Sequence, residues 1–324
     1  MLQSLRILAK QPLTVSLLFF SSSPIAVPLF KSLLEDKRFE VQGLVCQPDR
    51  PVGRDQVLTA PETKKLALEH GISVFQPEKL RAELDLLASF KKNPPDFLLT
   101  FAYGQILSED WLSLPRLAPL NVHPSLLPLY RGPTPIPASL LNGDKETGLT
   151  LMKMVPKMDA GPIAFQHTFA IEEGMNTGGL FDVVGLRAQE WIPDDLLKLM
   201  EALEFTEQDE SKVSFCSMLS KEDGYLDFAL SAEEILRRYR AYTPWPGLWT
   251  RCKGERLKLF DLTVGDPIIK LPQGHLAFEH ERLYVGTQSA PLEIGSLQAE
   301  GKQKLSVGAF LKGQSDFLKN VLPS

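Results

Sequence analysis

The chain has few cysteines for its 324 residues. Cys46, Cys216 and Cys252 are odd in number and far apart, which argues against a disulfide framework and against a zinc site of the CxxC type. The five histidines stand at no ligand-like spacing to one another or to cysteine, so no metal is predicted. A reducing compartment is expected.

Long apolar runs are also missing, since none reaches the roughly 18 residues that span a bilayer. The first 34 residues contain Arg6, Lys10 and Lys31 but no acid, and Leu13 to Phe20 is apolar, a pattern that a transit peptide shares. The same apolar run is a good first strand, and its removal would take part of a sheet. The cytoplasm is therefore the expected location, and an organellar matrix is the alternative.

Two phosphate-binding motifs are absent. The turn after the first expected strand reads Ser21-Ser22-Ser23-Pro24, without the glycines of GxGxxG, and GxxxxGK[ST] does not occur. An enzyme that uses NAD or ATP is therefore disfavoured, and no nucleotide cofactor is expected.

The length favours two domains, because one hydrophobic core rarely serves a chain of this size. Apolar strand-like runs alternate with helical stretches up to about residue 122, which predicts an α/β domain with a mostly parallel sheet. A helix follows from Thr177 to about Leu203, with Pro193 as a kink or break. We expect the first domain at 13–204, a polar linker at 205–220, and a small β-barrel or sandwich domain at 221–319.

The segment from Asn121 to Gly132 gathers the most useful chemistry. It follows an apolar strand and therefore lies where parallel sheets bind ligands. Asn121 and His123 are two apart on extended chain and project to one side. The amide can donate to a developing oxyanion, and the imidazole, whose unperturbed pKa is about 6.5, can take a proton. Asp159 would orient that imidazole if the fold brings its loop alongside.

Positive charge concentrates in one part of a chain whose net charge is -5. Between residues 237 and 258 seven basic residues face a single acid: Arg237, Arg238, Arg240, Arg251, Lys253, Arg256 and Lys258 against Glu255. Such a patch can neutralise phosphates, and a solvated basic surface is the alternative. Arg50 and Arg54, in the loop after the second strand, suit a phosphate contact or a surface ion pair with Asp49.

Several motifs in one order resemble the folate-dependent formyltransferases: NVHPSLLPLYRG at 121–132, NGDKETGLTLM at 142–152 and MDAG at 158–161. Within that family the chain is similar to the methionyl-tRNA formyltransferases in QPDRPVGR at 47–54, FAYGQIL at 101–107, SKEDG at 220–224, RAYTPWPG at 240–247 and KLSVGAFLKG at 304–313. The likeness covers about residues 15 to 319. It implies a Rossmann-like formyltransferase domain of α/β class and a smaller C-terminal OB-like β-barrel domain that helps hold tRNA.

The resemblance also implies a reaction and a site. A formyl group would pass from the co-substrate 10-formyltetrahydrofolate to the α-amino group of methionine on initiator tRNA, in a monomer that needs no metal. Asn121, His123 and Asp159 would be catalytic. The folate pocket would be lined by Ser125, Leu126, Leu127, Pro128, Tyr130, Arg131 and Gly132. The tRNA would be held by Arg50, Arg54, Arg237, Arg238, Arg240, Arg251 and Lys253.

Two positions depart from the family pattern. Ser22-Ser23-Pro24 stands where the family usually has Gly-Thr-Pro, and Asp55-Gln56-Val57 stands where a lysine-rich loop usually grips the acceptor end of tRNA. Electrostatic attraction of tRNA at that loop should be weaker. Two other functions therefore stay open: formylation of an amino sugar on a nucleotide, and noncatalytic binding of tRNA or folate.

Overall fold

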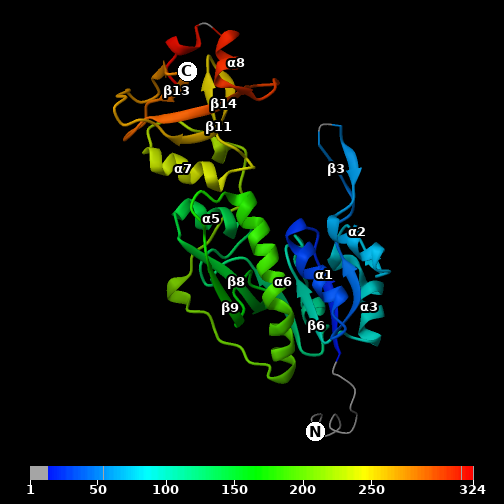
Figure 1. Cartoon of the computed structure of the whole chain (residues 1–324). Helices are drawn as coiled ribbons and strands as arrows, with labels where there is room; N and C mark the ends of the chain where they lie inside the picture. Colours follow the sequence, from blue (N-terminus) through cyan, green and yellow to red (C-terminus); the bar gives the residue numbers. More distant parts are fainter. Residues whose placement is uncertain (1–13, 54, 315, 324) are drawn as a thin grey trace. The chain divides into compact units, whose positions relative to one another are not determined.

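The structure is a computed structural model that describes residues 14–53, 55–314 and 316–323 (Figure 1). Its contacts divide the chain into two compact units. The first comprises the chain up to Arg131, Thr147–Phe169 and Phe181–Phe215, and the second comprises Gly132–Glu146, Ala170–Leu180 and the chain from Cys216 onward. Among the described residues no helix is long and apolar enough to cross a membrane.

The first unit is built on a seven-stranded sheet of order β5-β2-β1-β6-β7-β8-β9. The five strands from β5 to β7 pair in parallel and β8 runs antiparallel to β7, so the predicted mostly parallel α/β sheet is confirmed. After β2 the chain forms β5 at the edge and then returns to the other side of β1, so the strand order reverses between β1 and β6. The strands are β1 (Val15–Phe20), β2 (Phe39–Val45), β5 (Val74–Phe75), β6 (Phe97–Thr100), β7 (Ala118–His123), β8 (Glu146–Lys153) and β9 (Ile163–Ala170).

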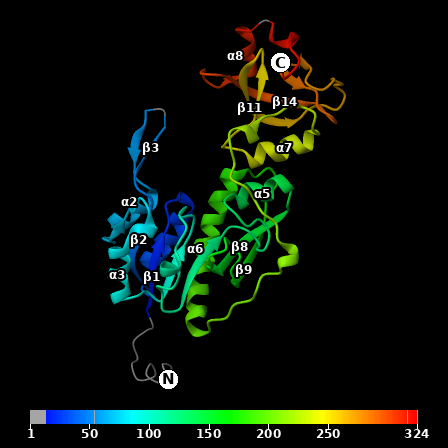
Figure 2. The ribbon, with the colours of Figure 1, turned by 180° about the vertical axis from the view of Figure 1, so that it is seen from behind.

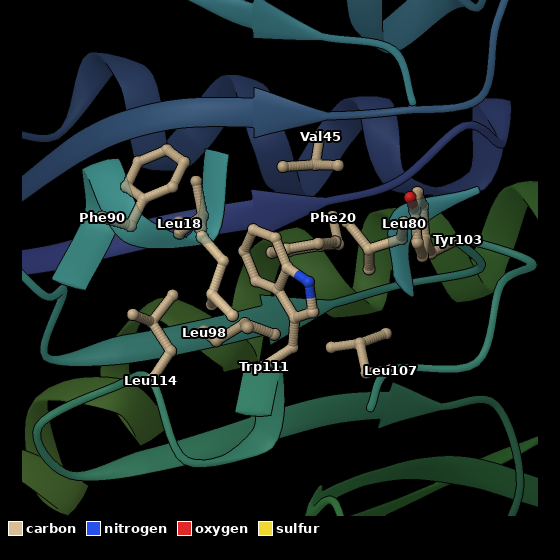
Figure 3. Packing of buried hydrophobic residues seen from close by; sticks show 11 residues of the cluster. Leu18, Phe20, Val45, Leu80, Phe90, Leu98, Tyr103, Leu107, Trp111 and Leu114 are labelled. Atoms are coloured by element: carbon tan, nitrogen blue, oxygen red, sulfur yellow. The ribbon is translucent and has the colours of Figure 1, made fainter. Parts of the chain in front are cut away.

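Successive residues of a strand point to opposite faces of the sheet, and apolar side chains pack against both faces. Phe19 stacks on Phe30 of α1, with ring centroids 4.8 Å apart, whereas Phe20 meets Trp111 of α4 edge-on at 5.7 Å. Figure 3 shows Trp111 among Phe20, Val45 and other buried side chains of the second face. Full burial of each such ring stabilises the fold by roughly 1.5–3 kcal/mol.

Most helices of the first unit lie between its strands in sequence, whereas α6 follows the last strand, β9, and enters this unit at Phe181. They are α1 (Val27–Glu35), α2 (Glu62–Glu69), α3 (Leu84–Lys92), α4 (Glu109–Leu112) and α6 (Thr177–Glu201), with single 3-10 turns η1 (Pro24–Ala26), η2 (Leu80–Ala82) and η3 (Glu210–Lys212). Helix α6 runs along β8 and β9 (Figure 2). It continues through Pro193, so of the kink or break predicted there the break does not occur. Ile192 before this proline and Leu196 after it are fully buried, and their packing stabilises the helix despite the hydrogen bond that a proline cannot make.

One element was not expected. The predicted loop after β2 forms a two-stranded antiparallel hairpin from β3 (Arg50–Val52) and β4 (Val57–Thr59). Its apolar side chains are all more than half exposed, namely Val52, Val57 and Leu58. The hairpin has no buried face, so the sequence lacks the apolar pattern by which strands are predicted.

The second unit contains an antiparallel sheet of order β10-β11-β14-β13-β12, with β15 beside β14. This confirms the smaller C-terminal β domain. Helix α7 begins at the predicted cap, where Ser231 and Glu234 form a capping box, and it lies against β11 (Figure 1), where the backbone N–H of Asp261 donates to Tyr239 Oη at 2.8 Å. The remaining elements are α5 (Pro135–Asn142), η4 (Glu222–Gly224), α7 (Ala232–Ala241), β10 (Trp249–Cys252), β11 (Glu255–Val264), β12 (Leu276–Glu279), β13 (Arg282–Val285), β14 (Leu292–Ala299), β15 (Leu305–Ser306), α8 (Val307–Lys312) and η5 (Phe317–Lys319).

Candidate active site

The strand β7 carries two of the predicted catalytic residues. Asn121 lies opposite Thr100 of β6 and Met152 of β8, and His123 is the last residue of the strand. Because β7 pairs with its neighbours without a register shift, the two side chains share one face. His123 is buried and Asn121 is half-buried.

Thr100 fixes the orientation of the Asn121 amide. Its hydroxyl Oγ1 lies 2.7 Å from Asn121 Oδ1 and donates to it. The amide oxygen is thereby occupied, and the Nδ2 group is turned the other way with its hydrogens available as donors. In the sequence Thr100 was one residue of an apolar strand, and only the pairing of β6 with β7 reveals its partner.

His123 has a defined tautomer because its two ring nitrogens meet different groups. Nε2 lies 3.0 Å from the carbonyl oxygen of Tyr130, which can only accept, so Nε2 carries a hydrogen and Nδ1 is the basic nitrogen. Burial holds the pKa of His123 below its ordinary value of 6.5, while the carboxylate of Asp159 and the Tyr130 carbonyl act in the opposite direction. The ring is therefore neutral at neutral pH.

Asp159 lies beside this imidazole, as the sequence hypothesis required. Its Oδ1 is 3.8 Å from His123 Nδ1, and the side chain is 15% exposed. The residue adopts a positive φ of 49°, a region that side chains other than glycine seldom enter. Gly161 allows the loop to lie close to β8, because a Cβ there would collide with the carbonyl oxygen of Lys153. The three predicted catalytic residues thus meet in one place.

The seven predicted pocket residues divide by exposure. Ser125, Leu127 and Arg131 are buried. The Ser125 hydroxyl donates to the carbonyl of Leu129 at 2.6 Å, and the Arg131 guanidinium donates to Gln208 and Glu210. The other four residues are half-buried and therefore have surface that a ligand could contact: Leu126, Pro128, Tyr130 and Gly132. The folate contacts of all seven remain a prediction.

Of the two arginines of the first unit that were predicted to hold tRNA, Arg50 begins β3. Arg50 forms an exposed ion pair with Glu78 at 3.1 Å, and Arg54 lies outside the described residues. In the turn, the side chain of Gln56 donates to the carbonyl of Gly53 at 2.9 Å, and Asp55 is exposed. Asp55 and Gln56, which stand where the family usually has a lysine-rich loop, therefore lie in the turn of the hairpin, and Val57 begins β4.

In the second unit the predicted basic residues occupy α7 and the β10–β11 hairpin. Arg237, Arg238 and Arg240 lie on α7, Arg251 on β10, and Lys253 in the turn that follows. The guanidinium of Arg256 lies over the buried ring of Trp249 at 4.0 Å, a cation–π contact within the β10–β11 hairpin. Their contact with tRNA stays a prediction.

The other departure has a structural consequence. Ser22, where the family usually has glycine, accepts a hydrogen bond from the backbone N–H of Gln47 at 2.7 Å. Its hydroxyl thereby ties the turn after β1 to the loop after β2.

Comparisons with known proteins identify the family of the chain. The sequence model "Formyl transferase" matches residues 15–195, and "Formyl transferase, C-terminal domain" matches residues 218–315. The methionyl-tRNA formyltransferase of Geobacter metallireducens is 37% identical over 300 residues, covering 92% of this chain and 96% of its own. That of Bacillus subtilis is 36% identical over 302 residues, covering 92% and 94%.

Solved structures share the fold at lower identity. An N-formyltransferase from Helicobacter canadensis, crystallised with folinic acid and dTDP-3-aminofucose, gives a TM-score of 0.65 at 17% identity, over 90% of this chain and 100% of its own. HypX from Aquifex aeolicus in complex with tetrahydrofolic acid gives 0.61 at 18% identity, over 94% of this chain and 48% of its own. These two similarities show the fold alone. The sequence matches extend over both halves of the chain and nearly the whole of each relative, so the chain belongs to the methionyl-tRNA formyltransferase family.

Proposed function

We propose that this protein transfers a formyl group from 10-formyltetrahydrofolate to the α-amino group of methionine on initiator tRNA. The observation that carries the proposal is the meeting of a directed amide, a neutral imidazole and a carboxylate at the end of β7. Membership of a folate-dependent family whose named relatives are methionyl-tRNA formyltransferases supports both substrates.

The three side chains suit the steps of this transfer. The neutral amine of methionine attacks the formyl carbon, and His123 Nδ1 accepts the proton that the amine loses. Positive charge then develops on the imidazole, where Asp159 Oδ1 stabilises it from 3.8 Å. The Nδ2 group of Asn121 donates to the formyl oxygen as it becomes anionic. When the bond from carbon to the folate nitrogen breaks, the imidazolium returns its proton to that nitrogen.

The folate site is inferred from half-buried residues of the loop after β7, and the tRNA site is inferred from positive charge. The half-buried residues Leu126, Pro128, Tyr130 and Gly132 would line the pterin-bearing co-substrate. The arginines of α7 and the β10–β11 hairpin would neutralise tRNA phosphates. Because the catalytic groups all come from one unit of one chain, we infer that a monomer suffices. The small number and wide spacing of the cysteines favour a cytoplasmic enzyme.

The direct test measures transfer of labelled formyl from 10-formyltetrahydrofolate to methionine-charged initiator tRNA, with uncharged tRNA and an amino-sugar nucleotide as parallel acceptors. We expect label on the charged tRNA alone. Label on the sugar nucleotide would identify the alternative enzyme, and label on neither, from folded protein, would leave a binding protein.

Variants then assign the chemistry. His123→Ala and Asp159→Ala should each lower kcat by at least about a hundredfold, from the usual scale of acid–base contributions. His167→Ala is the matched control, because His167 also pairs with an aspartate, Asp195, at 2.6 Å but belongs to β9 and not to the site. Normal turnover by His123→Ala would remove this histidine from the mechanism.

A further inference from the structure

We propose that Gln208 positions Asp159 against His123 by holding the backbone of the Asp159 loop. This inference deepens the proposed formyl transfer and rests on it. Gln208 belongs to the polar segment that the sequence marks as a linker, and its side chain bonds Arg131 and the backbone of the Asp159 loop. It would be a positioning residue.

The amide nitrogen of Gln208 donates twice to this loop. Nε2 lies 2.9 Å from the carbonyl oxygen of Asp159 and 2.7 Å from that of Gly161. Both of its hydrogens are thereby used, on carbonyls that flank the turn. Gln208 is 8% exposed, so water competes little for these bonds and each is worth more than a surface hydrogen bond.

Arg131 fixes which way this amide faces. Its Nε and Nη2 lie 3.0 and 2.8 Å from Gln208 Oε1. A guanidinium has only donors and a backbone carbonyl only acceptors, so an inverted amide would set donor against donor on one side and acceptor against acceptor on the other. The guanidinium is itself buried and anchored, with Nη2 2.6 Å from Glu210.

These contacts close a ring around the imidazole. Arg131 follows Tyr130, whose carbonyl accepts from His123 Nε2; Gln208 joins Arg131 to the Asp159 loop; and Asp159 faces His123 Nδ1. One structure thus sets the surroundings of both ring nitrogens. Asp159 is the charged group that faces the imidazole directly. Arg131 and Glu210 are linked to the imidazole only through intervening residues.

The Asp159 backbone gives Gln208 something to hold. Asp159 adopts a positive φ of 49°, which residues with a side chain seldom do, and Gln208 bonds the carbonyl oxygen of this residue and that of Gly161, two residues further on. A purely structural role, docking residues 205–215, is already filled by Thr206, which exchanges two backbone hydrogen bonds of 2.8 Å with Ile163. Removal of the Gln208 amide should therefore leave the segment docked and the protein folded.

The test uses Gln208→Met, which keeps the length of the side chain and removes the amide. We expect kcat for formyl transfer to fall by about tenfold, because a loosened carboxylate no longer supports the imidazolium, with KM for both substrates within about twofold. The pKa of His123, followed by NMR of histidine-labelled protein, should fall as it does in Asp159→Asn, since the displaced carboxylate no longer raises it. Lys212→Met is the control, because it places the same side chain elsewhere in segment 205–215 and removes only an exposed ion pair with Asp209 at 3.1 Å, which contributes little; it should leave the pKa of His123 and kcat unchanged.

An unchanged kcat and an unchanged His123 pKa in Gln208→Met would overturn the proposal, as would an equal effect of Lys212→Met. If Gln208→Met does not fold, Gln208→Asn replaces it, because the shorter amide cannot reach both Arg131 and the two carbonyls. If the wild-type protein transfers no formyl group, the proposed function fails, whereas the NMR pKa still tests the link between Gln208 and His123.

Discussion

Replacement of Thr100 by valine should expose how much the directed amide of Asn121 contributes. Thr100 is 3% exposed, and valine has nearly its shape, so packing on β6 is preserved. The substitution removes the donor that occupies Asn121 Oδ1 at 2.7 Å. The amide can then rotate and present its oxygen, in place of Nδ2, to the oxyanion.

The expected magnitude follows from the strength of one hydrogen bond. A net contribution of about 1 kcal/mol that no longer favours the productive orientation corresponds to about a fivefold loss in rate. Complete loss of an oxyanion donor costs about a hundredfold to a thousandfold, so Thr100→Val should remain far more active than Asn121→Ala. Thr100→Ser keeps the hydroxyl and should restore most of the rate.

The assay is kcat for formyl transfer to methionyl-tRNA with both substrates saturating, together with thermal unfolding of each variant. Two results would refute the reasoning. One is full kcat in Thr100→Val, which would mean that other contacts fix the Asn121 amide. The other is a Ser variant as slow as the Val variant, which would assign the loss to packing.

Three further predictions concern the site and its surroundings. NMR titration should give His123 a pKa below 6.5, because burial disfavours the charged ring, and a lower value still in Asp159→Asn, because the carboxylate raises that pKa; a midpoint above 6.5 in the wild type contradicts this. Gly161→Ala should lower kcat by at least about tenfold and reduce Tm, because its Cβ meets the Lys153 carbonyl and displaces the catalytic loop; wild-type kcat and Tm would show that the loop has room. Burial raises the pKa of the Cys46 thiol to about 12, so a thiol-specific reagent at mildly alkaline pH should leave Cys46 unmodified in the folded protein, and rapid labelling at Cys46, located by mass spectrometry, would contradict this.

The sheet could be predicted because each main strand has a recognisable local sequence pattern. Val15–Phe20 is fully buried on both faces, and a short continuous apolar run has few other uses. The β3–β4 hairpin could not be predicted, since its apolar residues face solvent and its pairing depends on a turn rather than on a buried face. At Pro193 the sequence left a kink or a break open, and the helix continues because its buried face outweighs the local cost of the proline.

The catalytic residues follow a similar division. Asn121 and His123 stand two apart on one strand, so their shared face is fixed by local geometry. Asp159 could be proposed only on the condition that its loop came alongside, and that condition depends on the chain returning through β8 and β9. Thr100 was hidden in an apolar run, because its role depends on the register between β6 and β7.

Gln208 could not be predicted from the sequence at all, because its role depends entirely on residues that are distant in the chain. Its neighbours in sequence are polar and show no period, and its partners Arg131 and Asp159 are 77 and 49 residues away. An amide is suited to such a position because it can accept from a guanidinium at one end and donate to carbonyls at the other. Because an uncharged amide holds the backbone of the Asp159 loop, residue 208 adds no charge of its own to the surroundings of His123, where a charge would shift the pKa of the imidazole.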